Sequence, residues 1–511
     1  MSQVSENSKR IAKNTLLLYF RMFFMMTVSL YTSRIILKTI GIEDYGIYNV
    51  VGGFVTMFGF LNTALSAATQ RYITFSIGQG DDKNLKKVFS NCVLTHAFIS
   101  LLFFILAETI GLWFLYNKMI IPSDRVVAAF WVFQCSILST VVLIMSVPYN
   151  ADIIAHEKMS AFAYISIIEV CLKLAIVYIL VISPIDRLIL YAILLLLVQC
   201  MIRLIYTIYC KKHFQESQFN WMWDAKLFKE MLVFACWNLW GGISNMLYTQ
   251  GLNILLNLFF GPIVNAARGI TVQVQNAIVQ FVNSFQMAIN PQITKNYAQG
   301  NLIDMHKLVV RSSKFTFILL FVISFPIFCE TDFILTIWLE TVPDYTVIFT
   351  RLMLCVVIID SVANPLMVST AATGNVKRYQ STIGGLMILI VPVSYIFLNL
   401  FRRPEIIYWV HISFCIITFI VRLYIVRPII HFNIREYVKN SIVPIIRIVI
   451  LSCIIIEVID KFLPQGRIWN LCNILVSFIV ALSCCFMVGL TSNERKMIYN
   501  KIYFLTNKVF K

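Results

Sequence analysis

Five carboxamide side chains fall on one face of a predicted helix between two glycines, Gly261 and Gly300. Their spacings of three, four, three and seven residues follow helical periodicity. A carboxamide in hydrocarbon is costly unless it forms hydrogen bonds or contacts water. We therefore expect this face to line a protein interior or a water-filled cavity, where amides can bind ligand hydroxyl groups. The five residues are Gln273, Asn276, Gln280, Asn283 and Asn290.

The preceding predicted helix adds more amides, interleaved with aromatic rings. Amides bind hydroxyl groups and aromatic rings stack on sugar rings, so this wall is suited to contacting a glycan. The same residues are equally suited to hydrogen bonds between neighbouring helices, and both interpretations stay open. The amides are Asn238, Asn245, Asn253 and Asn257, and the rings are Trp237, Trp240 and Tyr248.

Arginines within predicted helices are the second group that could bind a ligand. A guanidinium in the membrane is costly and binds phosphate or carboxylate well, so such a residue indicates a functional site. Arg21 lies in the cytoplasmic half of the first helix and is the best candidate to face a cavity, whereas Arg34 can reach the outer headgroups. The other candidates are Arg71, Arg268 and Arg351.

Acidic groups in the predicted helices could couple transport to an ion. Glu169 and Lys173 are four residues apart, hence on one helical face, where they form either a structural ion pair or an ion-coupled site. Glu108 and Asp360 are two further carboxylates within apolar stretches, and the sequence identifies no partner for either of them.

Composition fixes the broad class of the protein. The 511 residues are 59% hydrophobic and 13% charged, with a mean hydropathy of +0.80. A chain of this kind cannot bury its apolar surface in a soluble fold, so we expect a multi-pass membrane protein. The net charge of +17 is spread over short loops and gives no support for nucleic-acid binding.

The thirteen cysteines are scattered and lie mostly in apolar stretches. Neither a CxxC motif nor a Cys/His spacing typical of metal sites occurs, so we expect no metal site and no cofactor. No nucleotide-binding GxxxxGK[ST] motif occurs either.

Apolar spans of about 20 residues predict fourteen membrane-spanning helices. Their approximate ranges are 15–38, 46–76, 86–115, 123–150, 160–182, 187–210, 229–258, 263–290, 310–329, 344–372, 379–400, 406–426, 440–460 and 468–490.

We expect four parts along the chain. Residues 1–212 form an N-lobe of six helices, 213–228 a cytoplasmic interfacial linker, 229–430 a C-lobe of six helices, and 431–511 two extra helices with a basic tail. Basic residues concentrate in the connections that follow even-numbered helices and in both tails, which predicts that both termini are cytoplasmic.

The two lobes show traces of an internal repeat. Residues 41–80 and 261–300 both begin at a glycine turn and end in Gln-Gly or Ala-Gln-Gly. Residues 148–155 and 365–372 also correspond, at an offset of 217 rather than 220 residues. Such repeats are typical of transporters, although apolar helices can also resemble each other by chance.

Three segments resemble a known family, the Wzx-type polysaccharide or O-antigen flippases of the multidrug/oligosaccharidyl-lipid/polysaccharide (MOP) exporter superfamily. They are LKTIGIEDYGIYNVVGG, VPYNADIIAHEKMSAFAYISIIEVCLKL, and NLFFGPIVNAARGI with NPQITKNYAQGN, and the resemblance covers residues 10–430. It implies an all-α fold of two six-helix lobes around a cavity, as in MATE transporters. It also implies a bacterial inner-membrane protein that flips an undecaprenyl-diphosphate-linked oligosaccharide to the periplasmic leaflet by alternating access. Arginines in helices 1, 2 and 8 would then bind the diphosphate, which corresponds here to Arg21, Arg71 and Arg268.

Two other functions remain as alternatives. A cation-coupled multidrug exporter of the MATE type usually has a carboxylate in the first helix, which here has two arginines and no acid. A membrane polymerase or ligase would need acid/base residues on a large outer loop, and the outer loops are short. We therefore expect a transporter and not an enzyme. The expected partners are the anionic lipid-linked oligosaccharide, membrane lipid, and a polysaccharide polymerase with glycosyltransferases.

Overall fold

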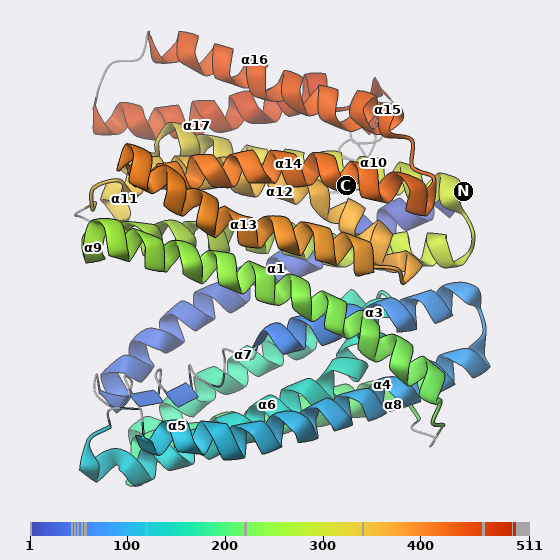
Figure 1. Ribbon diagram of the computed structural model, residues 1–511, viewed down its shortest axis with the longest axis vertical. Helices are drawn as coiled ribbons and strands as arrows, with labels where there is room; N and C mark the ends of the chain where they lie inside the picture. Colours follow the sequence, from blue (N-terminus) through green and yellow to red (C-terminus); the bar gives the residue numbers. More distant parts are fainter. Residues whose placement is uncertain are drawn as a thin grey trace, which may run out of the picture. The chain divides into compact units, whose positions relative to one another are not determined.

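The structure is a computed structural model of the chain, and Figure 1 shows its helices. It describes residues 3–41, 44, 47, 48, 51, 52, 55, 59–117, 119, 121–218, 222–339, 342–461, 466–492 and 494–496. Within these ranges the secondary structure is helical, with no β-strand. This confirms the predicted all-α membrane fold.

The first half of the chain contains seven described helices. They are α1 (Gln3–Ile40), α3 (Gly59–Gln79), α4 (Asp82–Leu106), α5 (Leu112–Asn117), α6 (Val126–Ala155), α7 (Met159–Ile182) and α8 (Arg187–His213). A π-helical turn (Ala107–Gly111) joins α4 and α5 into a single span, Asp82–Asn117, which agrees with the predicted helix 86–115. Most of the first part of the predicted helix 46–76 lies outside the described residues.

The second half begins with a long helix and ends with the two extra spans. Its helices are α9 (Ala225–Ala298), α10 (Leu302–Cys329), α11 (Thr331–Leu339), α12 (Thr346–Thr373), α13 (Lys377–Phe401), α14 (Ile406–Ile430), α15 (Ile434–Tyr437), α16 (Val443–Asp460) and α17 (Arg467–Cys484). A π-helical turn (Val438–Ile442) joins α15 to α16.

Among the described residues, ten helical spans are long and apolar enough to cross a membrane. Helices α1, α3 and the two arms of α9 add further long segments. Large apolar side chains stay exposed along the spans, for example Ile182 and Leu258. Such surfaces are unusual in soluble proteins and are expected where lipid is the solvent. The protein is therefore a multi-pass membrane protein.

Helix α9 consists of two helical arms that meet at a kink at Gly261, where φ is 76° and ψ is −167°. The kink lies between the two helices predicted at 229–258 and 263–290, so the structure agrees with that prediction. This backbone conformation is essentially restricted to glycine. Pro262 follows and has no main-chain N–H group. The kink therefore interrupts the helical hydrogen bonds at a position where one donor is already missing.

Replacing Gly261 with alanine is expected to lower the free energy of unfolding by about 1–3 kcal/mol, because a Cβ atom is strained at this φ and ψ. The matched control is Gly269→Ala in the same helix, where an added Cβ meets open space. That control should be neutral or slightly stabilising. Thermal unfolding of the purified variants checks the difference, and equal melting temperatures would contradict it.

The internal repeat is visible in the backbone. The glycines that bound the two corresponding stretches, Gly41, Gly80, Gly261 and Gly300, all have positive φ values. The 217-residue offset also relates Glu157, which follows α6 with a φ of 58°, to Gly374, which follows α12 with a φ of 82°. Helices α6 and α12 both contain an internal proline. The two halves thus share local backbone geometry at corresponding positions.

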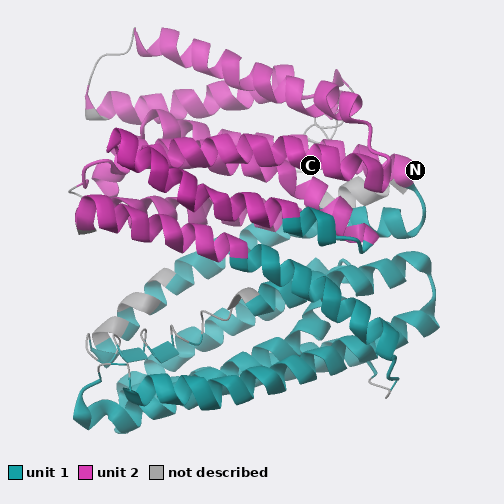
Figure 2. Ribbon diagram, in the orientation of Figure 1, with its two compact units in different colours: residues 1–243, 287–301, 374–381 teal, residues 244–286, 302–373, 382–511 magenta. Residues whose placement is uncertain are grey.

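Contacts divide the chain into two compact units, coloured separately in Figure 2. Unit 1 comprises residues 1–243, 287–301 and 374–381, and unit 2 comprises residues 244–286, 302–373 and 382–511. The first unit therefore includes the end of α9 and the start of α13, both from the second half of the sequence. The predicted lobe boundaries at 212 and 229 stay a prediction.

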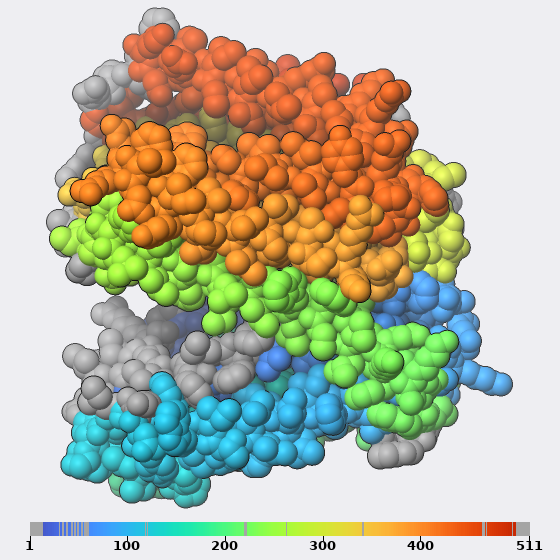
Figure 3. All heavy atoms as spheres, in the orientation of Figure 1, coloured from blue at the N-terminus to red at the C-terminus, as the bar shows by residue number. Residues whose placement is uncertain are grey.

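Each unit has its own packed helices. In unit 1, α6 packs against α8 and α3, and α1 packs against α7. In unit 2, α12 packs against α14 and α10, and α10 packs against α17. The side chains of α13 and α14 lie side by side in the space-filling view, where both are orange (Figure 3).

A buried ion pair ties the C-terminal segment to α10. Lys314 is only 3% exposed, and its Nζ donates to Glu494 Oε2 at 2.7 Å. Burial opposes ionisation of Glu494, but the Lys314 ammonium and the Thr491 amide outweigh it and lower the pKa of Glu494.

Replacing Glu494 with glutamine is expected to lower the free energy of unfolding by about 3 kcal/mol, because Lys314 is left as a buried unpaired charge. The second substitution Lys314→Met should recover part of this loss, since it removes the unpaired charge. Thermal unfolding in detergent measures both variants. If the Glu494→Gln protein is as stable as the wild type, the ion pair does not contribute to the free energy of unfolding.

Candidate functional site

The guanidinium group of Arg21 lies over an aromatic ring in unit 1. Its guanidinium carbon lies 4.4 Å from the ring centroid of Phe162 on α7, the helix that packs against α1. Among the described residues, its Nε is buried without a hydrogen-bond partner. Glu169 and Tyr206 are close enough to interact with it electrostatically. A half-buried guanidinium with unused donor capacity is suited to binding an anion.

Arg71 lies among rings near the end of α3. Its guanidinium carbon is 4.6 Å from the ring centroid of Tyr72, 4.7 Å from that of Phe75 and 5.8 Å from that of Phe234. It also packs against Gly374, where a Cβ atom would come within 2.8 Å of an Arg71 nitrogen. The glycine therefore makes room for the guanidinium.

The two predicted arginines of unit 2 bind main-chain carbonyl groups. Arg268 is 2% exposed and donates to the Thr249 carbonyl at 3.0 Å. Arg351 donates to the carbonyls of Phe328 and Cys329 at 3.1 and 3.2 Å, and thereby satisfies the last turn of α10. A structural role is sufficient to explain both contacts, and a role in ligand binding stays a prediction.

The carboxamide face of α9 is left uncovered. Gln273, Asn276, Gln280 and Asn283 are exposed, whereas Thr271, Ile278, Val282 and Ser284 on the same helix are buried. Asn290 is half-buried. In the part of the chain that the structure describes, these four amides are exposed, so their donors and acceptors can contact water or a ligand; a cavity along this face stays a prediction.

The amides earlier in α9 are used within the protein. Asn238 donates to the Phe234 carbonyl, and its Oδ1 accepts from Gln380 Nε2 at 2.9 Å. Asn245 Oδ1 lies 3.3 Å from the Thr249 hydroxyl. Asn238 therefore joins α9 to α13, which is the interhelical role that the sequence left open.

Two of the three acidic groups have partners that sequence reasoning did not identify. Glu169 pairs with Lys173 at 2.6 Å, as their spacing predicted. Asp360 pairs with Arg422 on α14 at 2.8 Å, and Glu108 accepts from Gln134 on α6 at 3.1 Å. These partners lie 62 and 26 residues away, so no local spacing could indicate them.

A cluster in unit 1 joins helix ends from both halves of the sequence, and we call it the helix-end junction. The carboxylate of Glu157 is 1% exposed and accepts from Lys295 Nζ at 2.8 Å and Gln292 Nε2 at 2.6 Å. Its main-chain carbonyl accepts from Asn14 Nδ2 at 3.4 Å. The end of α6 is thereby tied to α1 and to the end of α9.

The second part of the helix-end junction is a close approach of α3 to α9. A Cβ atom on Gly78 would lie 2.7 Å from the Ala298 Cβ, so only glycine fits there. Gly78 and Ala298 are 220 residues apart, which is the offset of the repeat. Corresponding positions of the two halves therefore touch each other. Sequence reasoning missed this site, although the repeat offset was a signal for it.

The linker is anchored where α9 begins. Asp224 accepts from the amides of Lys226 and Leu227 and pairs with Lys87 of α4. The hydrogen bond from Lys87 and these two amides lower the pKa of Asp224 to about 2. Trp223 lies against Phe228, with ring centroids 4.7 Å apart and an interplanar angle of 40°.

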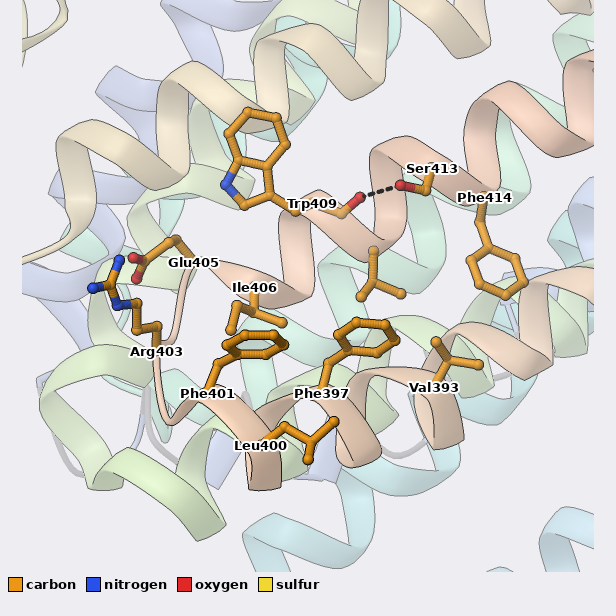
Figure 4. A pocket seen from close by; sticks show the side chains of 11 residues that line it. Val393, Phe397, Leu400, Phe401, Arg403, Glu405, Ile406, Trp409, Ser413 and Phe414 are labelled. Carbon is orange, nitrogen blue, oxygen red and sulfur yellow. Dashed lines mark hydrogen bonds between the residues drawn. The ribbon is translucent and has the colours of Figure 1, made fainter.

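A cavity of about 700 Å³ lies in unit 2 between α13 and α14 (Figure 4). Phe397, Phe401 and Trp409 dominate its lining, and Arg403 and Glu405 lie at one end. It contains none of the predicted site residues. Its apolar, open character fits a groove filled by lipid chains better than a site for a charged ligand.

Comparisons with known proteins place the chain in a family. The model of the polysaccharide biosynthesis protein family matches residues 11–297, whereas a search of the curated proteins finds no match. The fold is similar to that of a MATE protein in its bent conformation, with 12% identity, 83% of this chain and 96% of that chain covered, and a TM-score of 0.71.

Two further solved structures share the fold. One is an outward-facing multidrug resistance MATE family transporter of the MOP superfamily, with 13% identity, coverage of 83% and 96%, and a TM-score of 0.68. The other is a MOP superfamily transporter from Pyrococcus furiosus whose binding pocket has reverse polarity, with 12% identity, coverage of 83% and 96%, and a TM-score of 0.67. Because the family model covers more than half of its length, the chain belongs to the polysaccharide biosynthesis protein family, and it has the fold of the MATE transporters of the MOP superfamily.

Proposed function

We propose that this protein is a flippase that moves an undecaprenyl-diphosphate-linked oligosaccharide from the cytoplasmic to the periplasmic leaflet for cell-surface polysaccharide synthesis, including O-antigen. The observation that carries the proposal is Arg21, a guanidinium within the first helix whose Nε has no hydrogen-bond partner among the described residues. A lipid diphosphate brings negative charge into a low-dielectric region and needs such a group.

The glycan part of the cargo requires different chemistry. Its many hydroxyl groups need hydrogen-bond donors and acceptors that tolerate several geometries, which carboxamides provide. The exposed amides Gln273, Asn276, Gln280 and Asn283 on α9 supply them. Arg71 is the second cation that we assign to the diphosphate, whereas the buried Arg268 and the carbonyl-bound Arg351 are weaker candidates.

Alternating access gives the helix-end junction a role. The basic residues of the connections support a cytoplasmic location for Lys295 and for the segment after α6. A transporter that opens to the cytoplasm must part helices at that side, so we assign the Glu157–Lys295 pair and the Gly78–Ala298 contact to the closed cytoplasmic end. The lipid tail of the cargo would stay in the membrane during the movement.

The main alternative is a cation-coupled multidrug exporter, because structures with the same fold are MATE transporters. Described residues 15–38 contain arginine and no carboxylate, which gives this region the wrong sign for a cationic drug. The pair of Glu169 and Lys173 is where ion coupling would be sought first. An enzyme acting on lipid-linked glycan is a weaker alternative still.

The setting we propose is the bacterial inner membrane, with both termini in the cytoplasm. Partners would be the anionic lipid-linked oligosaccharide, the surrounding lipid, and a polymerase and glycosyltransferases that make and use the cargo.

Ligand binding to the purified protein in nanodiscs separates these functions. We expect undecaprenyl-diphosphate oligosaccharide to bind more tightly than the corresponding monophosphate, because the second phosphate adds charge-assisted hydrogen bonds. A cationic dye should not compete. Tight dye binding that the diphosphate lipid does not displace would favour the exporter.

A further inference from the structure

Three side chains with metal-binding atoms meet at the end of α6. Asp152 and His156 are four residues apart, hence on one face of the helix end, and Glu216 comes from the 3-10 turn Gln215–Ser217 in the linker. One ligand atom from each lies within 4.8 Å of the other two. None of them belongs to the ligand-binding groups described above, and the sequence spacing gave no reason to expect a metal.

Both carboxylates are deeply buried. Asp152 is 0% exposed and Glu216 is 6% exposed. Among the described residues, Asp152 Oδ1 and Glu216 Oε1 accept no hydrogen bond, and each faces a ring nitrogen of His156, at 3.3 and 3.1 Å respectively. The two carboxylates share a single imidazole, and Asp82 of α4 is a further acidic group close enough to Glu216 to interact with it electrostatically. The cluster therefore has an excess of negative charge.

The tautomer of His156 follows from its other contact. Its Nδ1 lies 3.1 Å from the main-chain carbonyl of Asp152, which can only accept, so Nδ1 carries the hydrogen. In the neutral ring, Nε2 then directs a lone pair toward Glu216 Oε1 at a distance of 3.1 Å, and a cation can bind between these two atoms. The hydrogen bond from Nδ1 also fixes the orientation of the imidazole ring. In metal sites, the ring nitrogen that does not bind the metal likewise donates to a carbonyl or carboxylate.

The surroundings hold the three groups in place. Ser217 Oγ donates to Asp152 Oδ2 at 2.6 Å, which orients that carboxylate. The Phe214 ring stacks on His156 with centroids 4.1 Å apart and an interplanar angle of 19°. The distance of 3.1 Å between Nε2 and Oε1 is close to the separation of about 3.3 Å between two ligands of a tetrahedral zinc ion with bonds near 2.0 Å.

We propose that Asp152, His156 and Glu216 bind a divalent transition-metal ion of the Zn²⁺ class and thereby fasten the linker to the end of α6. An imidazole with two carboxylates favours such an ion over Mg²⁺, which prefers oxygen ligands. Two carboxylates balance the charge of a divalent ion, whereas a proton on His156 leaves one negative charge uncompensated. Water can occupy the fourth coordination position of the ion because the His156 side chain is partly exposed.

Metal binding by the full-length protein tests this proposal without any transport measurement. After treatment with a chelator, the protein in nanodiscs is equilibrated with Zn²⁺, and bound zinc is measured by elemental analysis. We expect one equivalent per chain and a rise in melting temperature with added Zn²⁺. His156→Gln and Glu216→Gln should each lower the affinity at least tenfold and remove that rise.

The matched control is His213→Gln, because His213 is an exposed histidine near the same linker that stacks on Tyr209. It should bind zinc like the wild type. Zinc uptake that His156→Gln and Glu216→Gln leave unchanged, or no stoichiometric uptake by the wild type, would overturn the proposal. Cobalt(II) absorption provides a second measurement, since a tetrahedral site gives a strong visible band that must disappear in either variant. Failure of glycolipid transport would not affect this result.

Discussion

Replacing Arg21 with alanine is expected to reduce glycolipid translocation by about 10- to 100-fold, with little loss of stability. The guanidinium stacks on Phe162 and leaves its Nε without a partner among the described residues. A hydrogen bond to a charged group contributes about 1.5–3 kcal/mol, and 1.36 kcal/mol corresponds to a factor of ten in rate. The loss of one such bond to a diphosphate therefore accounts for the expected range.

Two further variants make this prediction specific. Arg21→Lys keeps the charge but loses the planar fork, so an intermediate rate is expected. Arg187→Ala removes an exposed arginine of the same unit and should transport like the wild type. The measurement is the initial rate of translocation in proteoliposomes, with thermal unfolding as the check on folding. Normal transport by Arg21→Ala would remove Arg21 from the binding site.

Breaking the Glu157–Lys295 pair is expected to have unequal effects depending on which partner is replaced. The Glu157 side chain is 1% exposed and that of Lys295 is 18% exposed. Lys295→Met leaves the buried carboxylate with one fewer donor and should lower the free energy of unfolding by about 3 kcal/mol. Glu157→Gln leaves an ammonium that can still reach water, so it should be the milder change. Thermal unfolding of the two single variants and the double variant measures the coupling.

The same variants should affect which side of the protein is accessible. Weakening the helix-end junction favours opening at the cytoplasmic end, so a cysteine placed at Ala298 should react faster with a membrane-impermeant reagent in Lys295→Met. Gly78→Val should act similarly through steric clash, because a Cβ there meets Ala298 at 2.7 Å. Lys307→Met, which breaks an exposed pair with Asp304, serves as control. Unchanged labelling in both variants would show that the junction does not gate access.

Much of the fold could be predicted from the sequence because the membrane requires long apolar helices. The spans after the first two helices lie close to their predicted ranges, as for α8 (Arg187–His213) against 187–210. The Gly-Pro pair predicted a break between two helices, and the structure has a non-helical backbone at Gly261, where the two arms of α9 meet.

The candidate site could be predicted only where local spacing determines the geometry. The pair of Glu169 and Lys173 followed from helical periodicity. The carboxamide face of α9 is exposed, and its role as a cavity lining stays a prediction. The partners of Glu157 lie more than 130 residues away, and those of His156 include a residue in the linker. Such contacts depend on how helices pack against each other, which does not follow from the spacing of residues in a single sequence.

We propose that the chain transports an anionic lipid-linked glycan rather than a cationic drug. The most direct test is reconstitution into liposomes, with translocation of an undecaprenyl-diphosphate oligosaccharide and efflux of a cationic dye measured in parallel. We predict glycolipid translocation without dye efflux. Dye efflux driven by a proton or sodium gradient, with no movement of the glycolipid, would contradict the account and make Glu169 the first residue to replace.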